Sequence, residues 1–158
     1  MLSLRLVVLF VHIVAVIVAL GGSLFSTFAL APVLAAELDP PARLRVSRRI
    51  IRRLGAIVLT SLAVLVVTGI LNVFFIGGVS ILLAIKLVLV LVVIGLALYQ
   101  YGNIGAQIWR AASPGPEVAA LQARFRRVGL TVGAIVLLII YLSIGLTRGS
   151  GAIVAMIR

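Results

Sequence analysis

Two ionisable side chains lie inside long apolar runs of this sequence. His12 is the only histidine and Lys86 the only lysine among the 158 residues. An ionisable group in hydrocarbon costs several kcal/mol and usually marks a functional site. An imidazole can ligate a metal or a haem iron, and an ammonium can pair with a bound anion.

The rest of the chain predicts the helices that must position these two residues. The sequence is 64% hydrophobic, with a mean hydropathy of +1.38. A membrane-spanning helix needs about 20 apolar residues. We therefore expect an all-α, polytopic membrane protein that forms one domain over residues 1–158, an up-down bundle of four transmembrane helices. The expected spans are about 4–34, 54–76, 79–101 and 128–147.

The expected breaks follow from glycine and proline. Gly77-Gly78 divides the second long apolar run, and Pro32 together with Glu37–Pro41 is expected to end the first helix. Pro116 and Glu117 predict a helix start, with an amphipathic segment over Glu117–Arg127 that leads into the fourth span. Three aromatic residues suit an interfacial belt: Tyr99, Tyr101 and Trp109.

The net charge of +11 follows the pattern of a membrane protein rather than that of a nucleic-acid-binding protein. Ten arginines fall in two of the three connections between spans: Arg43, Arg45, Arg48, Arg49, Arg52 and Arg53 in the first, and Arg110, Arg124, Arg126 and Arg127 in the third. Short basic loops are typical of the cytoplasmic side. We expect N-out/C-out topology in the inner (plasma) membrane, with the lipid bilayer as partner and no nucleic acid.

This topology converts positions into depths below the outer face. At 1.5 Å per residue, His12 lies about 12 Å and Lys86 about 10 Å below it. Thr68 and Asn72 of the second span fall at about 12 and 6 Å, and Tyr141 and Ser143 of the fourth at about 9 and 6 Å. Each span thus contributes polar groups to one layer. The candidate site residues are His12, Lys86, Thr68, Asn72 and Tyr141.

The chemistry of this layer favours a bound cofactor over catalysis. The three acidic residues, Glu37, Asp39 and Glu117, are expected near the other face, so Lys86 must be neutral, extend to the head groups, or meet a bound anion. Haem b, with His12 as axial ligand and a propionate beside Lys86, would satisfy both residues. Copper is a weaker candidate, because ligands other than His12 are scarce. A site without any cofactor also remains open.

Each of these polar residues also has a structural interpretation. Lys86 can snorkel towards the outer head groups, and His12 can hydrogen-bond a neighbouring helix as a neutral imidazole. Thr68 and Asn72 are common as hydrogen-bonding contacts between helices. No combination of residues characteristic of hydrolysis or phosphoryl transfer is present.

Parts of the sequence resemble a known family. The segments HIVAVIVALGGSLFSTFALAPVLA, RRLGAIVLTSLAVLVVTGILN and LLAIKLVLVLVVIGLALYQ look like the first three helices of the copper-resistance D (CopD-like) membrane proteins. The helical layout is also similar to the HemJ-type protoporphyrinogen oxidases. That second resemblance implies a haem site in which a first-helix histidine, here His12, and a third-helix lysine, here Lys86, serve binding and activity.

Three functions follow, in this order of preference. The first is a CopD-like protein that binds or handles haem or a metal at an outer-leaflet His12/Lys86 site. The second is a non-catalytic accessory subunit of a larger membrane complex. The third is a HemJ-like oxidase. A homodimer that shares one haem between two His12 side chains is a further arrangement to consider.

Overall fold

The computed structural model describes residues 2–76 and 81–156, and within these ranges the chain is helical with no strand. The first helical stretch comprises α1 (Leu2–Phe25), η1 (Ser26–Leu30) and α2 (Ala31–Glu37), and α3 (Pro40–Ile76) follows. The third stretch comprises α4 (Ile81–Leu98), η2 (Tyr99–Ile104) and α5 (Gly105–Arg110), and α6 (Pro116–Met156) is the last. The all-α prediction is confirmed.

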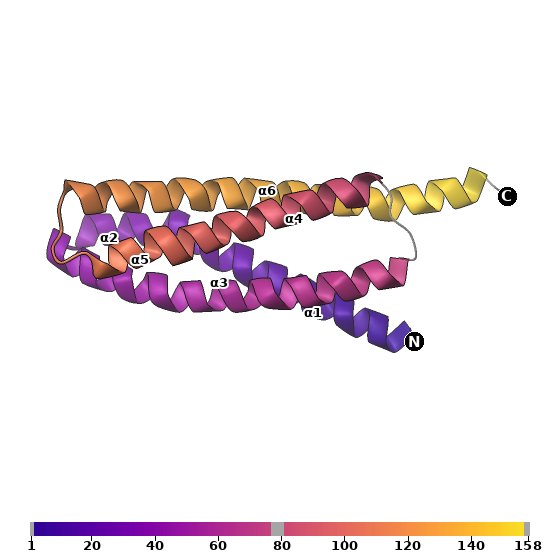
Figure 1. The fold of residues 1–158 in the computed structure, drawn as a ribbon, viewed down its shortest axis with the longest axis horizontal. Helices are drawn as coiled ribbons and strands as arrows, with labels where there is room; N and C mark the ends of the chain where they lie inside the picture. The colour runs from indigo at the N-terminus through magenta and orange to yellow at the C-terminus, as the bar shows by residue number, and fades with distance from the viewer. Residues whose placement is uncertain (1, 77–80, 157–158) are drawn as a thin grey trace.

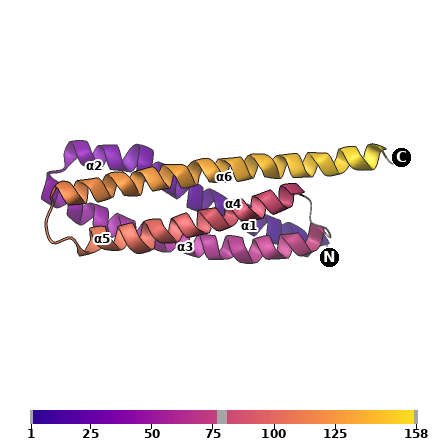
Figure 2. The ribbon, with the colours of Figure 1, turned by 45° about the horizontal axis from the view of Figure 1, so that its top comes forward.

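Four helical stretches are long and apolar enough to cross a membrane, as predicted: Leu4–Glu37, Pro40–Phe75, Ile81–Arg110 and Pro116–Ile144. Successive stretches run in opposite directions, so the bundle is of the up-down type (Figure 1). The principal helix pairs are α1 with α3 and α4 with α6. η2 and α5 connect the pairs through their contacts with α6 and α3 (Figure 2). The predicted break at Gly77-Gly78 lies outside the described residues, between the end of α3 and the start of α4.

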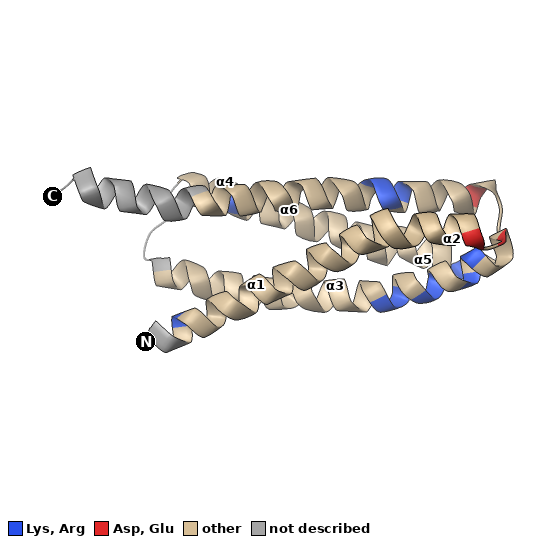
Figure 3. Ribbon diagram, turned by 180° about the vertical axis from the view of Figure 1, so that it is seen from behind, with Lys and Arg blue, Asp and Glu red and all other residues tan. Residues whose placement is uncertain are grey.

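The helices extend further towards the basic end than the apolar runs do. The arginine-rich segment 43–53, expected as a connection, forms the first turns of α3, and Glu117–Arg127 is continuous with the fourth span in α6. Arginine is a good helix former, and a proline opens each helix at the position where its missing N–H costs nothing. Lys and Arg accordingly concentrate at the end where α3 and α6 begin (Figure 3).

The prediction that Pro32 helps to end the first helix is wrong. Pro32 lies in the first turn of α2, and the helical path continues to Glu37. The preceding segment η1 is a π-helix whose Ser26 carbonyl accepts a hydrogen bond from the Ala31 N–H. Local π-type bonding lets a membrane helix accommodate a proline. Leu38, with φ −115° and ψ 137°, is the residue at which the helix stops.

The best-packed region lies at the basic end of the bundle. Leu44, Ile104, Ile108 and Val118 form a buried cluster, and Ile104 and Ile108 are 1% and 0% exposed. Arg48 donates to the carbonyl of Ala111 and so links α3 to the chain after α5. This packing fixes the ends of the helices relative to one another.

Candidate functional site

The inward-facing side of three helices carries the polar residues of interest. On α1, His12 lies between Val8 and Ala15, which are 8% and 7% exposed. The spacing of four and three residues places all three on one helical face, and that face packs on α3. His12 therefore points into the bundle rather than towards the surrounding medium.

His12 forms a hydrogen bond with a residue of α3. The sequence did not predict which residue this would be. The distance between His12 Nδ1 and Thr68 Oγ1 is 2.7 Å. Thr68 is 7% exposed, and its hydroxyl also lies 2.7 Å from the Val64 carbonyl oxygen one turn earlier. A hydroxyl has a single hydrogen, and the Val64 carbonyl can only accept, so Thr68 donates to Val64. His12 Nδ1 must then be the donor to Thr68.

This network assigns the tautomer of the neutral imidazole. With the proton on Nδ1, the other ring nitrogen, Nε2, has a free lone pair. Among the described residues, none forms a hydrogen bond with Nε2. Histidines that ligate metals have the same arrangement, because they donate one ring N–H to a protein group and coordinate through the other nitrogen. The geometry thus leaves Nε2 available as a ligand.

Gly69 lies beside the imidazole of His12, next to Thr68 on α3. A Cβ atom added to Gly69 would lie 3.8 Å from His12 Cε1, an ordinary van der Waals contact. A hydrogen at this position therefore leaves a narrow space above the ring edge, and a methyl group would just fill it. Thr68 orients His12, and the position of Gly69 would also tolerate an alanine.

Lys86 lies on the inward face of α4. Leu83 and Val93, three residues before and seven after it, are 4% and 7% exposed. Lys86 is half-buried and is close enough to His12 for an electrostatic interaction between the two. In the part of the chain that the structure describes, no carboxylate forms an ion pair with Lys86. A half-buried ammonium without a partner favours an anion beside it.

The other two predicted site residues are placed differently. Asn72 follows Thr68 by one helical turn on the same face of α3 and is half-buried. Tyr141 on α6 is 73% exposed, and no hydrogen bond between described residues joins it to His12 or Lys86. The hydroxyl of Ser143 bonds within its own helix, to the Ile139 carbonyl at 2.6 Å. The structure therefore brings His12, Thr68 and Lys86 together.

Residues suited to a protein-only metal site are scarce. The described residues contain no group of three or more His, Cys, Asp or Glu side chains that could hold a metal ion. A porphyrin brings four nitrogen ligands and needs only one or two from the protein. The residues present fit a single axial ligand better than a complete coordination shell for a bare ion.

A second polar cluster, nearer the basic end, was missed from the sequence. Tyr101, expected in an interfacial belt, instead packs between helices, where its hydroxyl hydrogen-bonds with Ser23 of α1. Its ring meets that of Phe125 edge-on at 5.3 Å. The neighbouring Gln100 is 6% exposed and donates through Nε2 to the Phe125 carbonyl at 3.0 Å. Gly129 lies against the same side chain, since an added Cβ there would be 2.8 Å from Gln100 Nε2.

Comparison with known proteins adds no functional information. The chain matches no protein-family profile, and no curated protein or solved structure is significantly similar to it.

Proposed function

We propose that this chain is a multi-pass membrane protein that binds haem or a related metal cofactor through His12, with Lys86 as the partner of an anionic group. The observation that carries the proposal is the hydrogen bond from His12 Nδ1 to Thr68, which leaves Nε2 free to coordinate. The resemblance of three segments to the CopD-like proteins motivates the same assignment. The bundle would lie N-out/C-out in the plasma membrane, as its basic connections favour.

The cofactor that fits these residues best is haem b. When bound, it would supply an iron that accepts an axial imidazole and propionates that carry negative charge. Thr68 would hold the ring of His12 in one orientation and one tautomer. Lys86 would neutralise a propionate in a region where an unpaired charge is costly. Copper has less support, because Cu(I) favours several sulfur or imidazole ligands.

Cofactor binding or handling is the leading function, and a HemJ-like oxidase ranks below both it and an accessory subunit. His12, Thr68 and Lys86 offer one ligand, one orienting hydroxyl and one cation, which together meet what an anionic, iron-containing cofactor needs from the protein. Asn72 is the nearest additional polar group on α3, at the next turn from Thr68. It would serve the binding site rather than a catalytic step.

Absorption spectroscopy of purified protein tests the proposal. In detergent, with and without dithionite, the wild type should show a Soret band and reduced α and β bands, and His12→Ala should lose them. Thr131→Ala is a matched control, because Thr131 is an exposed threonine that bonds only to the Arg127 carbonyl of its own helix, at 3.1 Å. It should retain the wild-type spectrum.

The opposite result would favour a different function. If the wild type carries no chromophore and no stoichiometric metal, and haem titration gives no spectral change that depends on His12, the cofactor proposal fails. The chain would then be better described as an accessory subunit. Its fixed partners should in that case be recovered equally well with wild type, His12→Ala and Lys86→Met.

A further inference from the structure

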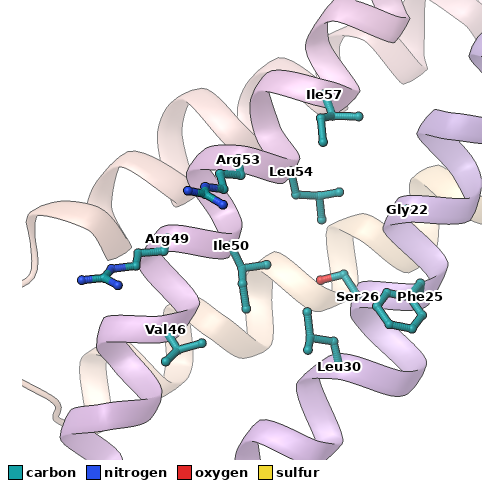
Figure 4. Close-up of a pocket in the computed structure, with 10 residues that line it drawn as sticks. All are labelled: Gly22, Phe25, Ser26, Leu30, Val46, Arg49, Ile50, Arg53, Leu54 and Ile57. Atoms are coloured by element: carbon teal, nitrogen blue, oxygen red, sulfur yellow. The ribbon is translucent and has the colours of Figure 1, made fainter.

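A groove lies between α1 and α3, away from His12, near the basic end of the bundle. Its volume is about 380 Å³, within the usual range of ligand pockets, roughly 300–1,000 Å³. The walls are largely apolar, and the apolar side chains of α3 face those of α1 across the space (Figure 4). Ser26 contributes the one hydroxyl among the residues that line it.

Two arginines line this groove on its α3 side, and their side chains extend outward from α3, away from α1 (Figure 4). Arg49 and Arg53 are one helical turn apart, and both are exposed. Among the described residues, neither guanidinium has an ion-pair partner. Arg48, by contrast, donates a hydrogen bond to the Ala111 carbonyl. The α3 side of the groove therefore carries two positive charges that are available to a ligand.

The groove also spans the boundary between the polar and apolar parts of α3. Arg53 is the last arginine of the helix, and Leu54 and Ile57 continue the wall into the apolar run. On the other side, Gly22, Phe25 and Leu30 belong to an uncharged stretch. A ligand that fits would have an anionic head at the arginines and a hydrocarbon tail beside the leucine and isoleucine side chains.

We propose that this groove binds an anionic diacyl phospholipid from the leaflet at the basic end of the bundle. Arginine is suited to phosphate because its planar fork donates two parallel hydrogen bonds. Basic pockets between membrane helices commonly hold anionic head groups. An acyl chain lies along Ile50, Leu54 and Ile57, and Ser26 offers a hydrogen bond to an ester oxygen. This inference requires membrane insertion but does not depend on a cofactor at His12.

Native mass spectrometry of the detergent-solubilised full chain tests this site. The protein is titrated with dioleoyl phosphatidylglycerol and, separately, with dioleoyl phosphatidylcholine. Wild type should bind the anionic lipid about tenfold more tightly than the zwitterionic one, and Arg49→Gln/Arg53→Gln should lose that preference. Ser26→Leu fills the groove without changing charge and should weaken binding of both lipids.

The control variant removes the same charge elsewhere. Arg45 and Arg126 are exposed and do not line the groove, so Arg45→Gln/Arg126→Gln should behave as wild type. An equal loss in both double variants would mean a diffuse basic surface and would overturn the proposal. So would equal binding of the two lipids. Competition by soluble glycerol phosphate at the same concentration as lipid would indicate a phosphate site without a lipid groove, which also contradicts it.

Discussion

At His12 the two ring nitrogens have different surroundings. Nδ1 has a protein partner in Thr68, whereas Nε2 has none among the described residues. A histidine that served only as a contact between helices would need nothing more than the Thr68 bond. A free Nε2 is required of a ligand and is equally compatible with a structural histidine, so the cofactor decides between the two roles, whereas the tautomer itself can be tested without any cofactor.

We predict that neutral His12 is predominantly the Nδ1–H tautomer. Because His12 is the only histidine, ¹⁵N-histidine labelling gives one pair of ring signals, provided that the affinity tag lacks histidine. Nδ1 should resonate as a protonated nitrogen and Nε2 as an unprotonated one. Thr68→Val should convert this to a mixture of tautomers, and any haem affinity should fall about 10- to 100-fold. Thr131→Val should change neither.

A protonated Nε2 in the wild type would contradict this assignment.

A second comparison concerns the space beside the His12 ring at Gly69. Gly69→Ala adds a methyl at contact distance from the imidazole and should preserve the signals, whereas Gly69→Leu should displace the ring. If Gly69→Leu left the tautomer and the spectrum unchanged, His12 would not lie against this part of α3.

At the scale of the elements, one aromatic side chain of η2 packs against several helices at once. Tyr101 contacts three other helices: α1 through Ser23, α3 at Gly55 and α6 through Phe125. Because these contacts surround the Tyr101 ring, the ring has little room to shift when a neighbouring residue gains a methyl group. Gly55 is required because a Cβ there would lie 2.9 Å from Tyr101 Cδ1.

We predict that Gly55→Ala destabilises the bundle and that Gly95→Ala does not. Overpacking of this kind typically costs about 1–3 kcal/mol, which would lower the melting temperature in detergent by roughly 2–10 °C. An added Cβ at Gly95 meets nothing within 4 Å, and alanine is the better helix former. In a Tyr101→Ala background, Gly55→Ala should cost little. Equal melting temperatures for the two single variants would show that Tyr101 is not clamped at Gly55.

The sequence predicted where the helices lie along the chain better than it predicted which face of each helix points into the bundle. Long apolar runs reveal a membrane span, but a helix that is apolar on all sides does not indicate which face points inward. Depth alone grouped Tyr141 with His12, and the structure leaves Tyr141 on an exposed face. The inward faces are marked instead by small and polar residues, such as Ser61, Thr68 and Gln100, which are buried.

At the scale of the whole molecule, the basic residues and the candidate site lie at different levels of the bundle. The arginines concentrate where α3 and α6 begin (Figure 3). His12 and Lys86 lie near the starts of α1 and α4, which are at the opposite end of the bundle. If the basic end is cytoplasmic, His12 and Lys86 lie in the outer half of the bilayer. A cofactor at this level would approach from the outer leaflet, and the proposed lipid from the inner one.

The orientation of the bundle can be measured because the sequence contains no cysteine. Single cysteines outside the spans, Ser3→Cys before the first span and Ser113→Cys between α5 and α6, report the two ends without a background signal. A membrane-impermeant maleimide should label the cysteine at position 3 in intact cells, and the one at position 113 only after permeabilisation, because thiols in water react readily. The positive-inside rule favours this result, since ten of the fourteen basic residues lie at the end that includes position 113.

Labelling at position 113 in intact cells would invert the topology and place the cofactor site in the cytoplasmic half of the membrane. The lipid groove would then face the outer leaflet. The tautomer of His12 and the clamp on Tyr101 would be unaffected, because both depend on contacts within the bundle alone.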